Sequence, residues 1–425
     1  MCSLEKELRI MIFDSVKLYY FVRSDFFHHN HIHNRKVEIL RNSGINAEMV
    51  AIVSRQEFIK YKSEYINAKQ NYGVNVLKGF IGGSGHRYFS LFVKTYFLLQ
   101  SLLHKKIIIQ CLLVNCKPII QLRDLSYIRS KLSLITEYEG DLPAECAYWG
   151  SVGLPGGPLE SPLPQSVDKY NELLSDQLLE LSSSDGIICV SNEHLKLIKS
   201  RTALNVKALI YPTFPNVKFA SFNAESRSKI RKNIGYEKNI IFTHLGGVVN
   251  PWHRFSDICK LIKQLHSKCS SIRLLGLIRQ SELDSAEKMV SKHEIGDIVK
   301  LIYVPPNQVG DYLSAADVGI FVRHNHTMTR IVSSAKLGEY LSNGLPVLST
   351  GAHSVYNEFI EKNNLSIKIS EELSINDKIL LEIQSASQLE TSVSLREDAG
   401  NIFNREFNIP EYENDYKMFC KQFLN

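Results

Sequence analysis

Hydrophobic and polar positions alternate along the chain between short apolar runs and longer segments with helical periodicity. This alternation is typical of parallel β-sheets with helices on both faces. The predicted strands of the first half are 9–13, 48–53, 75–81, 106–114, 132–138, 186–191 and 207–212. Those of the second half are 239–245, 271–278, 299–304, 318–323, 345–350 and 365–369. The second set recurs about every 25 to 30 residues, a spacing that suits βα units.

The predicted fold class is therefore α/β, with two doubly wound Rossmann-like domains that face a cleft. Residues 211–235 connect the halves and contain two prolines, which discourage a continuous helix or strand. We accordingly predict a first domain at 1–215 and a second at 216–400. Ligands of doubly wound sheets bind at the carboxyl ends of the strands, so the site is expected at those ends.

A helix at 401–425 is expected to end the chain. Tyr412, Tyr416, Phe419 and Phe423 recur at four- and three-residue steps, which is the pattern of one buried helix face. An exposed helix with such a stripe would tend to aggregate, so this helix must pack against one of the two domains.

Composition and charge restrict the class of protein. The 425 residues are 44% hydrophobic and 22% charged, enough to bury a full core. The net charge of +6 is too small to indicate nucleic-acid binding, but it suits anionic substrates or a lightly anionic membrane surface. The eight cysteines form no CxxC pair, which favours a reducing cytosol over a disulfide framework or a zinc site.

The sequence shows no targeting segment and predicts no membrane span. The most hydrophobic region, 88–114, is interrupted by polar residues and is interpreted as a helix followed by a buried strand. We expect a cytoplasmic protein, with peripheral contact at the inner face of a membrane as an open alternative.

The segment 330–352 holds the most informative group of polar residues. Ser333 and Ser334 are candidate N-caps of a helix that begins near 335. A helix N-terminus is an anion site, and Lys336 adds a positive charge to it. Glu339, on the same side of the helix, could accept hydrogen bonds from a diol such as a ribose. The alternative is an ordinary solvated Lys/Glu pair.

Three further residues lie where predicted strands end. Gly246 and Gly247 permit close approach of a ligand to the backbone, although an ordinary tight turn is the alternative. Arg323 is expected to face the cleft, with a structural ion pair as the alternative.

A histidine cluster at 28–33 is the main candidate for a metal site. It has no carboxylate or cysteine at ligand spacing, so we predict no metal and expect an acceptor-facing or simply exposed loop. Glu139, Asp141 and Glu145 form an acidic cluster that could bind acceptor hydroxyls or cap the next helix.

The string KLGEYLSNGLPV, residues 336–347, resembles the nucleotide-sugar signature of GT-B fold glycosyltransferases, especially glycosyltransferase family 4. The resemblance covers most of the second domain and, more loosely, 134–145 and 189–196 of the first. It implies that Glu339 binds the ribose of the donor. It also implies that Ser333, Ser334 and the neighbouring backbone amides hold the donor diphosphate.

This sequence departs from the family pattern at two places. The family usually has a first glutamate, contacting the transferred sugar, where this chain has Ile331. His324, His326 or Arg330 could occupy that space.

The family's basic pair, which grips the diphosphate, is also altered. Gly247 or Val248 falls at the arginine position, and His253 or Arg254 falls at the lysine position. We favour Arg254, since a permanently charged guanidinium suits a diphosphate better than an imidazole. The alternative is that Arg254 is a surface residue of the following helix.

The resemblance implies a retaining glycosyltransferase that moves a sugar from a nucleotide diphosphate donor to a glycan or lipid-linked acceptor in surface polysaccharide (capsule or O-antigen) biosynthesis. The first domain would bind the acceptor, and the terminal helix would cross back onto it. Lys336 and Arg254 are the expected catalytic residues. The donor-binding set is Gly246, Gly247, Arg323, Ser333, Ser334 and Glu339.

No cofactor, metal or nucleic-acid partner is expected. The chain has no Asp-x-Asp pair, which argues against the metal-dependent GT-A type. Two alternatives stay open, namely a nucleotide-sugar epimerase of the same fold and a catalytically silent sugar-nucleotide-binding subunit.

Overall fold

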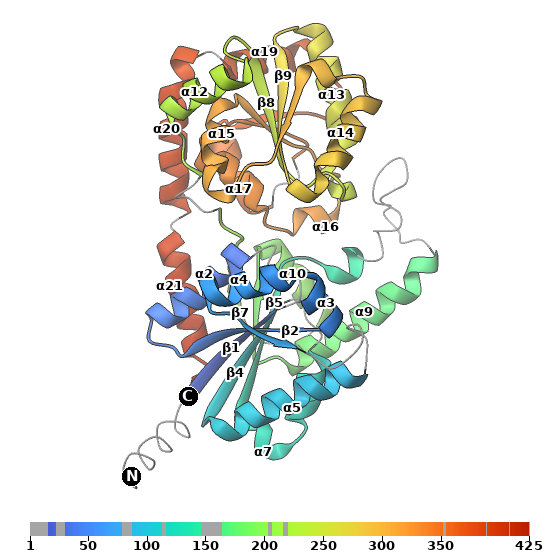
Figure 1. The fold of residues 1–425 in the computed structure, drawn as a ribbon, viewed down its shortest axis with the longest axis vertical. Helices are drawn as coiled ribbons and strands as arrows, with labels where there is room; N and C mark the ends of the chain where they lie inside the picture. Colours follow the sequence, from blue (N-terminus) through green and yellow to red (C-terminus); the bar gives the residue numbers. More distant parts are fainter. Residues whose placement is uncertain are drawn as a thin grey trace. The chain divides into compact units, whose positions relative to one another are not determined.

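The structure is a computed structural model that describes residues 16–22, 30–78, 87–112, 116–145, 164–202, 206–215, 220–351, 354–387, 389–407 and 409–424. The chain forms two compact units (Figure 1). The first comprises Met1–Glu139, Asn171–Tyr211 and Pro410–Asn425, and the second comprises Gly140–Tyr170 and Pro212–Ile409. The predicted strand at 9–13 and the histidine side chains at 28–33 lie outside the described residues.

The first unit is built on a seven-stranded parallel sheet in the order β3-β2-β1-β4-β5-β6-β7. Its strands are β1 (Val16–Val22), β2 (Ala47–Val53), β3 (Asn75–Lys78), β4 (Lys106–Leu112), β5 (Leu132–Tyr138), β6 (Gly186–Cys189) and β7 (Lys207–Ile210). The central strands are near-continuous apolar runs because helices cover both faces of the sheet.

The helices of this unit follow its strands in alternation. They are α2 (Asn30–Asn42), α3 (Arg55–Lys60), α4 (Lys62–Tyr72), α5 (Arg87–Leu103), α6 (Lys117–Arg123), α7 (Ser126–Arg129), α10 (Asn192–Arg201), and most of α9 (Pro164–Ser183) and α21 (Ile409–Lys421). Among the helices that the structure describes, none has both the length and the apolar character needed to span a bilayer.

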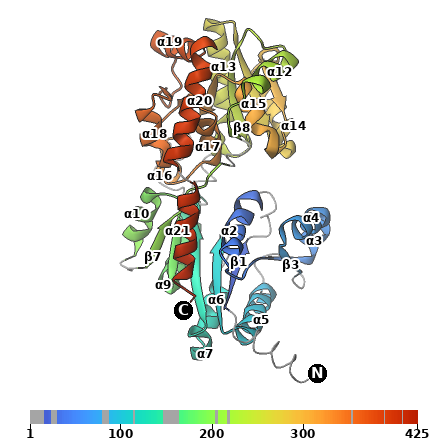
Figure 2. The same cartoon turned by 90° about the vertical axis from the view of Figure 1, so that its left-hand side faces the viewer.

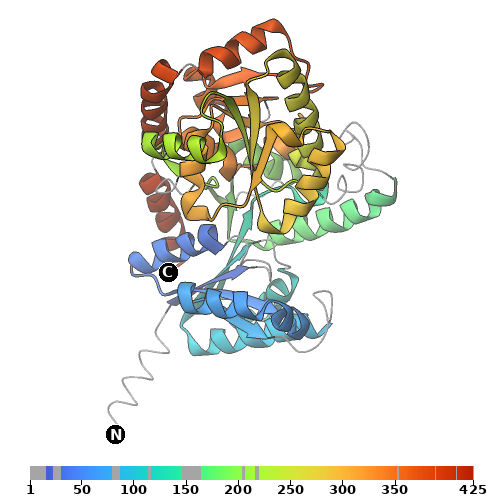
Figure 3. The same cartoon turned by 45° about the horizontal axis from the view of Figure 1, so that its top comes forward.

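The second unit has a six-stranded parallel sheet in the order β10-β9-β8-β11-β12-β13. Its strands are β8 (Ile240–Gly246), β9 (Ile272–Ile278), β10 (Val299–Ile302), β11 (Val318–Phe321), β12 (Val347–Ser349) and β13 (Ser366–Lys368). Its helices include α12 (Ala224–Ile234), α13 (Phe255–Lys268), α14 (Leu283–Lys292), α15 (Val309–Ala315) and α16 (Thr327–Arg330). They continue with α17 (Ala335–Ser342), α18 (Asn357–Lys362), α19 (Asp377–Ala386) and α20 (Leu389–Glu406), and helices cover both faces of the sheet (Figure 3).

Three of the four residues of the predicted aromatic stripe are buried in the first unit, and the fourth, Tyr412, is half-buried. Tyr416, Phe419 and Phe423 are all buried, and the Tyr416 hydroxyl donates a hydrogen bond to Gln110 Oε1 at 2.8 Å. Figure 2 shows α21 running alongside the strands of this unit. Gln110 in turn donates to the buried Glu137 carboxylate, so a buried polar chain fastens α21 to the sheet.

The division of the chain differs from the sequence-based boundaries at two segments. Residues 401–409, predicted as part of the terminal helix 401–425, group with the second unit, because α20 continues to Glu406 and α21 begins only at Ile409. Residues 140–170, which the sequence placed in the first domain, group with the second unit. The described part of this segment lies against the chain that follows α16, since a Cβ on Gly140 would stand 3.7 Å from Val332 Cγ1.

A buried ion cluster holds the starts of β8 and β11 together. Asp317 bonds to Arg227 and to Arg231, the latter at 3.1 Å. Its carboxylate also accepts a hydrogen bond from the Ile241 amide at 2.7 Å, while the Asp317 amide donates to the Ile241 carbonyl at 2.7 Å. Arg396 of α20 binds carbonyls at the end of α15 beside this cluster. The two central strands are therefore fixed relative to each other.

Candidate active site

The strand order places a topological switch point between β8 and β11. The chain leaves β8 toward β9 and leaves β11 toward β12, on opposite sides. The loops after the two strands diverge there and leave a crevice at the carboxyl ends, which is the usual ligand site of such sheets. The residues that follow β8 and β11, together with the start of α17, therefore form the candidate site.

The glycine turn after β8 allows close approach between chain segments. Gly246 has φ of 104°, a conformation that favours glycine, and a Cβ there would stand 3.6 Å from the Lys336 ammonium. A Cβ on Gly247 would lie 3.0 Å from a Glu282 oxygen and 3.1 Å from His253 Nε2. Both glycines therefore allow polar side chains to reach the backbone of this turn.

Lys336 and His253 form the central polar pair of the site. Lys336 Nζ donates to His253 Nδ1 at 3.2 Å. Burial, together with the charge of Lys336, lowers the pKa of His253 far below its ordinary value. The imidazole is therefore neutral and accepts the hydrogen bond from the Lys336 ammonium. Burial also lowers the pKa of His244, whose Nε2 lies 3.1 Å from the Gly247 carbonyl. The two histidines support the turn as neutral groups.

Two cations, Arg323 and Lys336, lie at the crevice without a direct counter-ion among the described residues. Burial lowers the pKa of Arg323 to about 10, and burial together with Arg323 and Arg279 lowers the pKa of Lys336. Within the described part of the chain, neither residue forms a salt bridge to a carboxylate. A partly buried pair of cations without a direct counter-ion is a site that favours an anion.

Glu339 lies one turn into α17 beside these cations. Burial raises the pKa of its carboxyl to about 7, against the opposing charge of Lys336. The helix that carries it is fixed by its neighbours: the Tyr340 hydroxyl accepts from the Leu245 amide at 2.9 Å, and Gly338 packs against Pro215. Glu339 is therefore a preorganised acceptor on a rigid helix.

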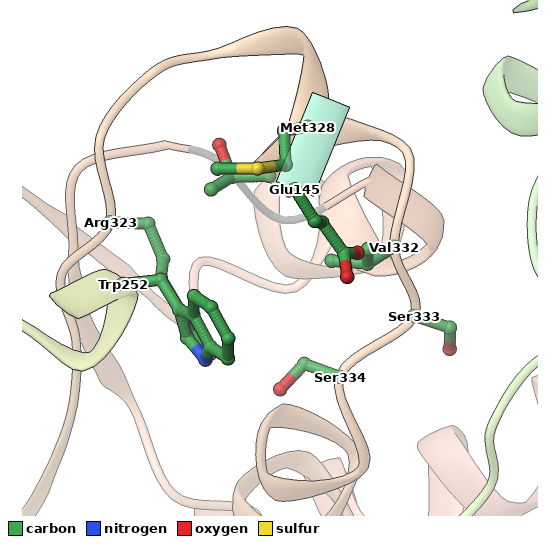
Figure 4. Close-up of a pocket in the computed structure, with 8 residues that line it drawn as sticks. Glu145, Trp252, Arg323, Met328, Val332, Ser333 and Ser334 are labelled. Atoms are coloured by element: carbon green, nitrogen blue, oxygen red, sulfur yellow. The ribbon is translucent and has the colours of Figure 1, made fainter. Parts of the chain in front are cut away.

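A cavity of about 240 Å³ opens beside this cluster. It is lined by Glu145, Trp252, Arg323, Met328, Thr329, Val332, Ser333 and Ser334 (Figure 4). The Ser334 hydroxyl points toward the Trp252 indole, and it makes no capping hydrogen bond to α17. The Ser333 hydroxyl instead accepts a hydrogen bond from the Thr213 amide at 3.0 Å. Of the two serines, Ser334 is the one available to a ligand.

Arg254 forms its hydrogen bonds outside the cluster of Lys336 and His253. Its Nε donates to Asp257 at 3.0 Å and one terminal nitrogen donates to the Glu371 carbonyl at 2.9 Å. Arg254 adopts φ of 51° directly before α13, and this turn brings His253 to Lys336. Of the two residues considered for the family's lysine position, the structure brings His253, and not Arg254, to the other site residues.

His324, His326 and Arg330, the residues considered in place of the family's first glutamate, are not among the residues that line the cavity. Ile331 is buried, and the His326 ring caps the short helix α16 by accepting from the Met328 amide. His324 lies 3.9 Å from Glu371. The carboxylate that lines the cavity next to Val332 is Glu145.

Two contributors, Trp252 and Glu282, were not among the candidate site residues. Glu145 was expected in an acidic cluster that could face the acceptor, and His253 was one of the two candidates for the family's lysine position. Glu282 accepts from the amides of Val248 at 2.6 Å and Val249 at 2.9 Å, so it holds the turn after β8. The sequence signal that could have identified it is a carboxylate just after the β9 strand, the neighbour of β8 in the sheet.

No protein-family model matches this chain, and no curated protein sequence matches it. Solved structures do match its fold. HepE of Anabaena, in complex with UDP and glucose, aligns over 96% of this chain and 99% of its own with 10% identity and a TM-score of 0.61. The pneumococcal O-GlcNAc transferase GtfA, in complex with UDP and GlcNAc, aligns over 97% and 99% with 10% identity and a TM-score of 0.61.

WaaG, a glycosyltransferase involved in lipopolysaccharide biosynthesis, is similar over 95% of this chain and 99% of its own, with 12% identity and a TM-score of 0.58. Identities of this size establish the fold alone. The chain has the two-domain GT-B architecture with a Rossmann-like sheet in each unit, and the fold class predicted from the sequence is confirmed.

Proposed function

We propose that this protein is a glycosyltransferase whose second unit binds a nucleotide diphosphate sugar at the β8–β11 switch point. The observation that carries the proposal is a pair of partly buried cations that have no salt bridge to a carboxylate among the described residues. Lys336 lies in the first turn of α17, and Arg323, which follows β11, lines the cavity together with Ser333 and Ser334. A diphosphate supplies the missing negative charge, and charged hydrogen bonds to it are the strong kind.

Each group around the cations has a chemical task in this proposal. Ser334 and the N-terminus of α17 donate to the diphosphate, as helix N-termini do for anions. Glu339 accepts hydrogen bonds from the ribose diol. His253 is a positioning residue, because its neutral ring accepts from Lys336 and fixes where the ammonium points.

The transferred sugar would occupy the cavity between Trp252 and Glu145. An indole offers an apolar face to the C–H groups of a sugar ring, and a carboxylate accepts from sugar hydroxyls. Glu145 thus supplies the carboxylate that Ile331 cannot.

Catalysis in this proposal is electrostatic. Bond breaking between the sugar and the diphosphate builds negative charge on the leaving oxygen, and Lys336 and Arg323 are already in place to stabilise it. The proposed reaction retains anomeric configuration, uses no metal, and transfers the sugar to a glycan or lipid-linked acceptor in surface-polysaccharide assembly. The UDP present in the HepE and GtfA structures supports a uridine nucleotide as the first donor to test.

The test is a donor-turnover assay with the full-length protein. UDP-sugars are incubated with and without a lipid and glycan extract, and both UDP release and sugar incorporation are measured. The proposal expects turnover that depends on the extract and is lost in Lys336→Met, while Leu381→Gln, an exposed change on α19, behaves as wild type. Isomerised donor without an acceptor would indicate an epimerase, and UDP-sugar binding without any turnover would indicate a silent binding subunit. Either result would contradict the proposal.

A further inference from the structure

The outward face of α5 in the first unit is apolar. Its exposed positions are Leu91, Thr95, Leu99, Leu102 and Leu103, which recur at three- and four-residue steps and so form one stripe. The four leucines are 61%, 52%, 45% and 43% exposed. The opposite face is also apolar, because Val93 and Phe97 are fully buried against the sheet. A helix with apolar residues on two opposite faces is normally covered on both of them.

The apolar stripe extends onto α7. Lys131 connects the two helices, since its ammonium donates to the Ser101 carbonyl of α5 at 3.4 Å and stands 4.8 Å from the centre of the Tyr127 ring. Tyr127 and its neighbour Leu125 are both more than half exposed. Figures 1 and 2 show α5 and α7 close together in the first unit. We call the exposed residues Leu91, Leu99, Leu102, Leu103, Leu125 and Tyr127 the α5–α7 patch.

The sequence segment that carries the patch is strongly basic, although Lys117 and Arg123 pair with Asp176 and Asp185 of other segments. Residues 65–123 contain no aspartate or glutamate, but they contain eight lysines and arginines: Lys69, Lys78, Arg87, Lys94, Lys105, Lys106, Lys117 and Arg123. Lys105, directly after α5, is exposed, and so is Arg129 at the end of α7. Asp124 is the one acidic residue between 65 and 136. The net charge of +6 of the whole chain is thus smaller than the excess in this segment alone.

We infer that the α5–α7 patch docks on an anionic lipid bilayer surface. Leucines on the outer face of a helix insert into the boundary between headgroups and acyl chains, and lysines around them bind anionic headgroups. Both requirements are met here by one helix and its neighbour. The patch belongs to the first unit and the proposed donor site to the second, and the inference holds whether or not the proposed transfer reaction is correct.

A second copy of this chain is the competing occupant. Two copies of the patch would bring together Lys94, Lys105 and Arg129 of each copy, and none of these three forms a salt bridge among the described residues. Like charges at a symmetric interface oppose association. The charge distribution therefore favours a lipid surface over self-association.

The experiment is vesicle co-sedimentation with the full-length protein. Vesicles of equal parts phosphatidylglycerol and phosphatidylcholine are compared with vesicles of phosphatidylcholine alone. The patch variant is Leu99→Gln/Leu102→Gln/Leu103→Gln. The matched control is Leu381→Gln/Leu395→Gln, which removes two similarly exposed leucines from α19 and α20 of the second unit. Thermal unfolding of each variant verifies that it is folded.

We expect wild type and the control to sediment with the anionic vesicles, and the patch variant to bind at least about tenfold more weakly. Binding should also decline steeply as salt is raised, because the lysines act through screened charge. Equal sedimentation of the patch variant and wild type would overturn the inference. So would a wild-type dimer that the patch variant converts to a monomer, since the occupant would then be a second copy. A second variant, Lys94→Gln/Lys105→Gln, leaves the leucines in place and should weaken binding to anionic vesicles; unchanged binding would contradict the charge argument.

Discussion

Glu339→Gln should raise the free energy of unfolding of the donor-free protein and should weaken donor binding. The pKa of the Glu339 carboxyl rises from 4.5 to about 7, mainly because the group is buried. Each unit of pKa difference corresponds to about 1.4 kcal/mol, so an ionised Glu339 costs the folded state up to about 3 kcal/mol above pH 7. Glutamine has nearly the same shape and avoids this cost.

The sign of the effect gives a pH window. A carboxyl whose pKa is raised by folding binds a proton in the folded state between about pH 4.5 and pH 7. The cost of Glu339 is therefore complete above pH 7, decreases as the pH falls, and disappears below about pH 4.5. In urea denaturation we expect Glu339→Gln to be more stable than wild type by about 1 to 3 kcal/mol near pH 8, and the gain to shrink near pH 5.

Donor binding should respond in the opposite direction. A charged acceptor contributes roughly 1.5 to 3 kcal/mol to a hydrogen bond, so loss of the carboxylate should weaken donor binding by about 10- to 150-fold. Wild-type affinity should also fall as the pH drops below 7, whereas the affinity of Glu339→Gln should not. The matched control is Glu287→Gln on the exposed side of α14. Equal stability near pH 8 together with equal donor affinity would refute the assignment of Glu339 to the site.

Three further outcomes are expected. Asp317→Asn should destabilise the protein by about 3 to 5 kcal/mol in urea denaturation, because Arg227 and Arg231 would stay buried without their carboxylate; a loss below about 1 kcal/mol would show that their carbonyl contacts suffice. Tyr416→Phe should lower the free energy of unfolding by about 1 to 3 kcal/mol, since Gln110 would lose its hydroxyl donor; an unchanged unfolding temperature would show that α21 does not depend on this bond. Sugar transfer should persist in EDTA, as cations of the protein supply the positive charge; a loss that Mn²⁺ or Mg²⁺ restores would contradict the metal-independent reaction.

The pattern of apolar runs predicted most strands of the two sheets. All six strands of the second unit were expected from the sequence, and their ends differ by a few residues at most. Buried parallel strands leave a strong signal because every position along them is apolar. Pro212 and Pro215, which interrupt regular structure, follow Tyr211, where a segment of the first unit ends.

The strand β1 was missed, although it is central to the first sheet. Its sequence is VKLYYFV, and its two tyrosines and Lys17 are more typical of an amphipathic segment than of a core strand. Tyr20 is tolerated there because its hydroxyl donates to the buried Glu137 carboxylate at 3.1 Å. That carboxylate is supplied by β5, more than a hundred residues away, so no local pattern could reveal it.

The site residues could be predicted most readily where they lie close together in the sequence. Lys336, Glu339 and Ser334 belong to one helix start, so their proximity follows from helical spacing. The choice between His253 and Arg254 depends on the backbone at 254, where the left-handed conformation turns the guanidinium toward Asp257. Glu145 joins the cavity only through tertiary packing. Side chains brought in from distant segments leave no spacing pattern to detect.

Isothermal titration calorimetry, with nucleotides titrated into the full-length protein, tests the central claim most directly because it measures binding affinity. The account places a diphosphate on Arg323 and Lys336, so UDP, or one of GDP, CDP and ADP, should bind wild type in the micromolar range. The double variant Arg323→Met/Lys336→Met should bind at least about a hundredfold more weakly, because two charged contacts are lost. Glu287→Gln should bind as wild type does. Absence of binding for all four nucleotides, or equal binding by the double variant, would contradict a donor site at the β8–β11 switch point.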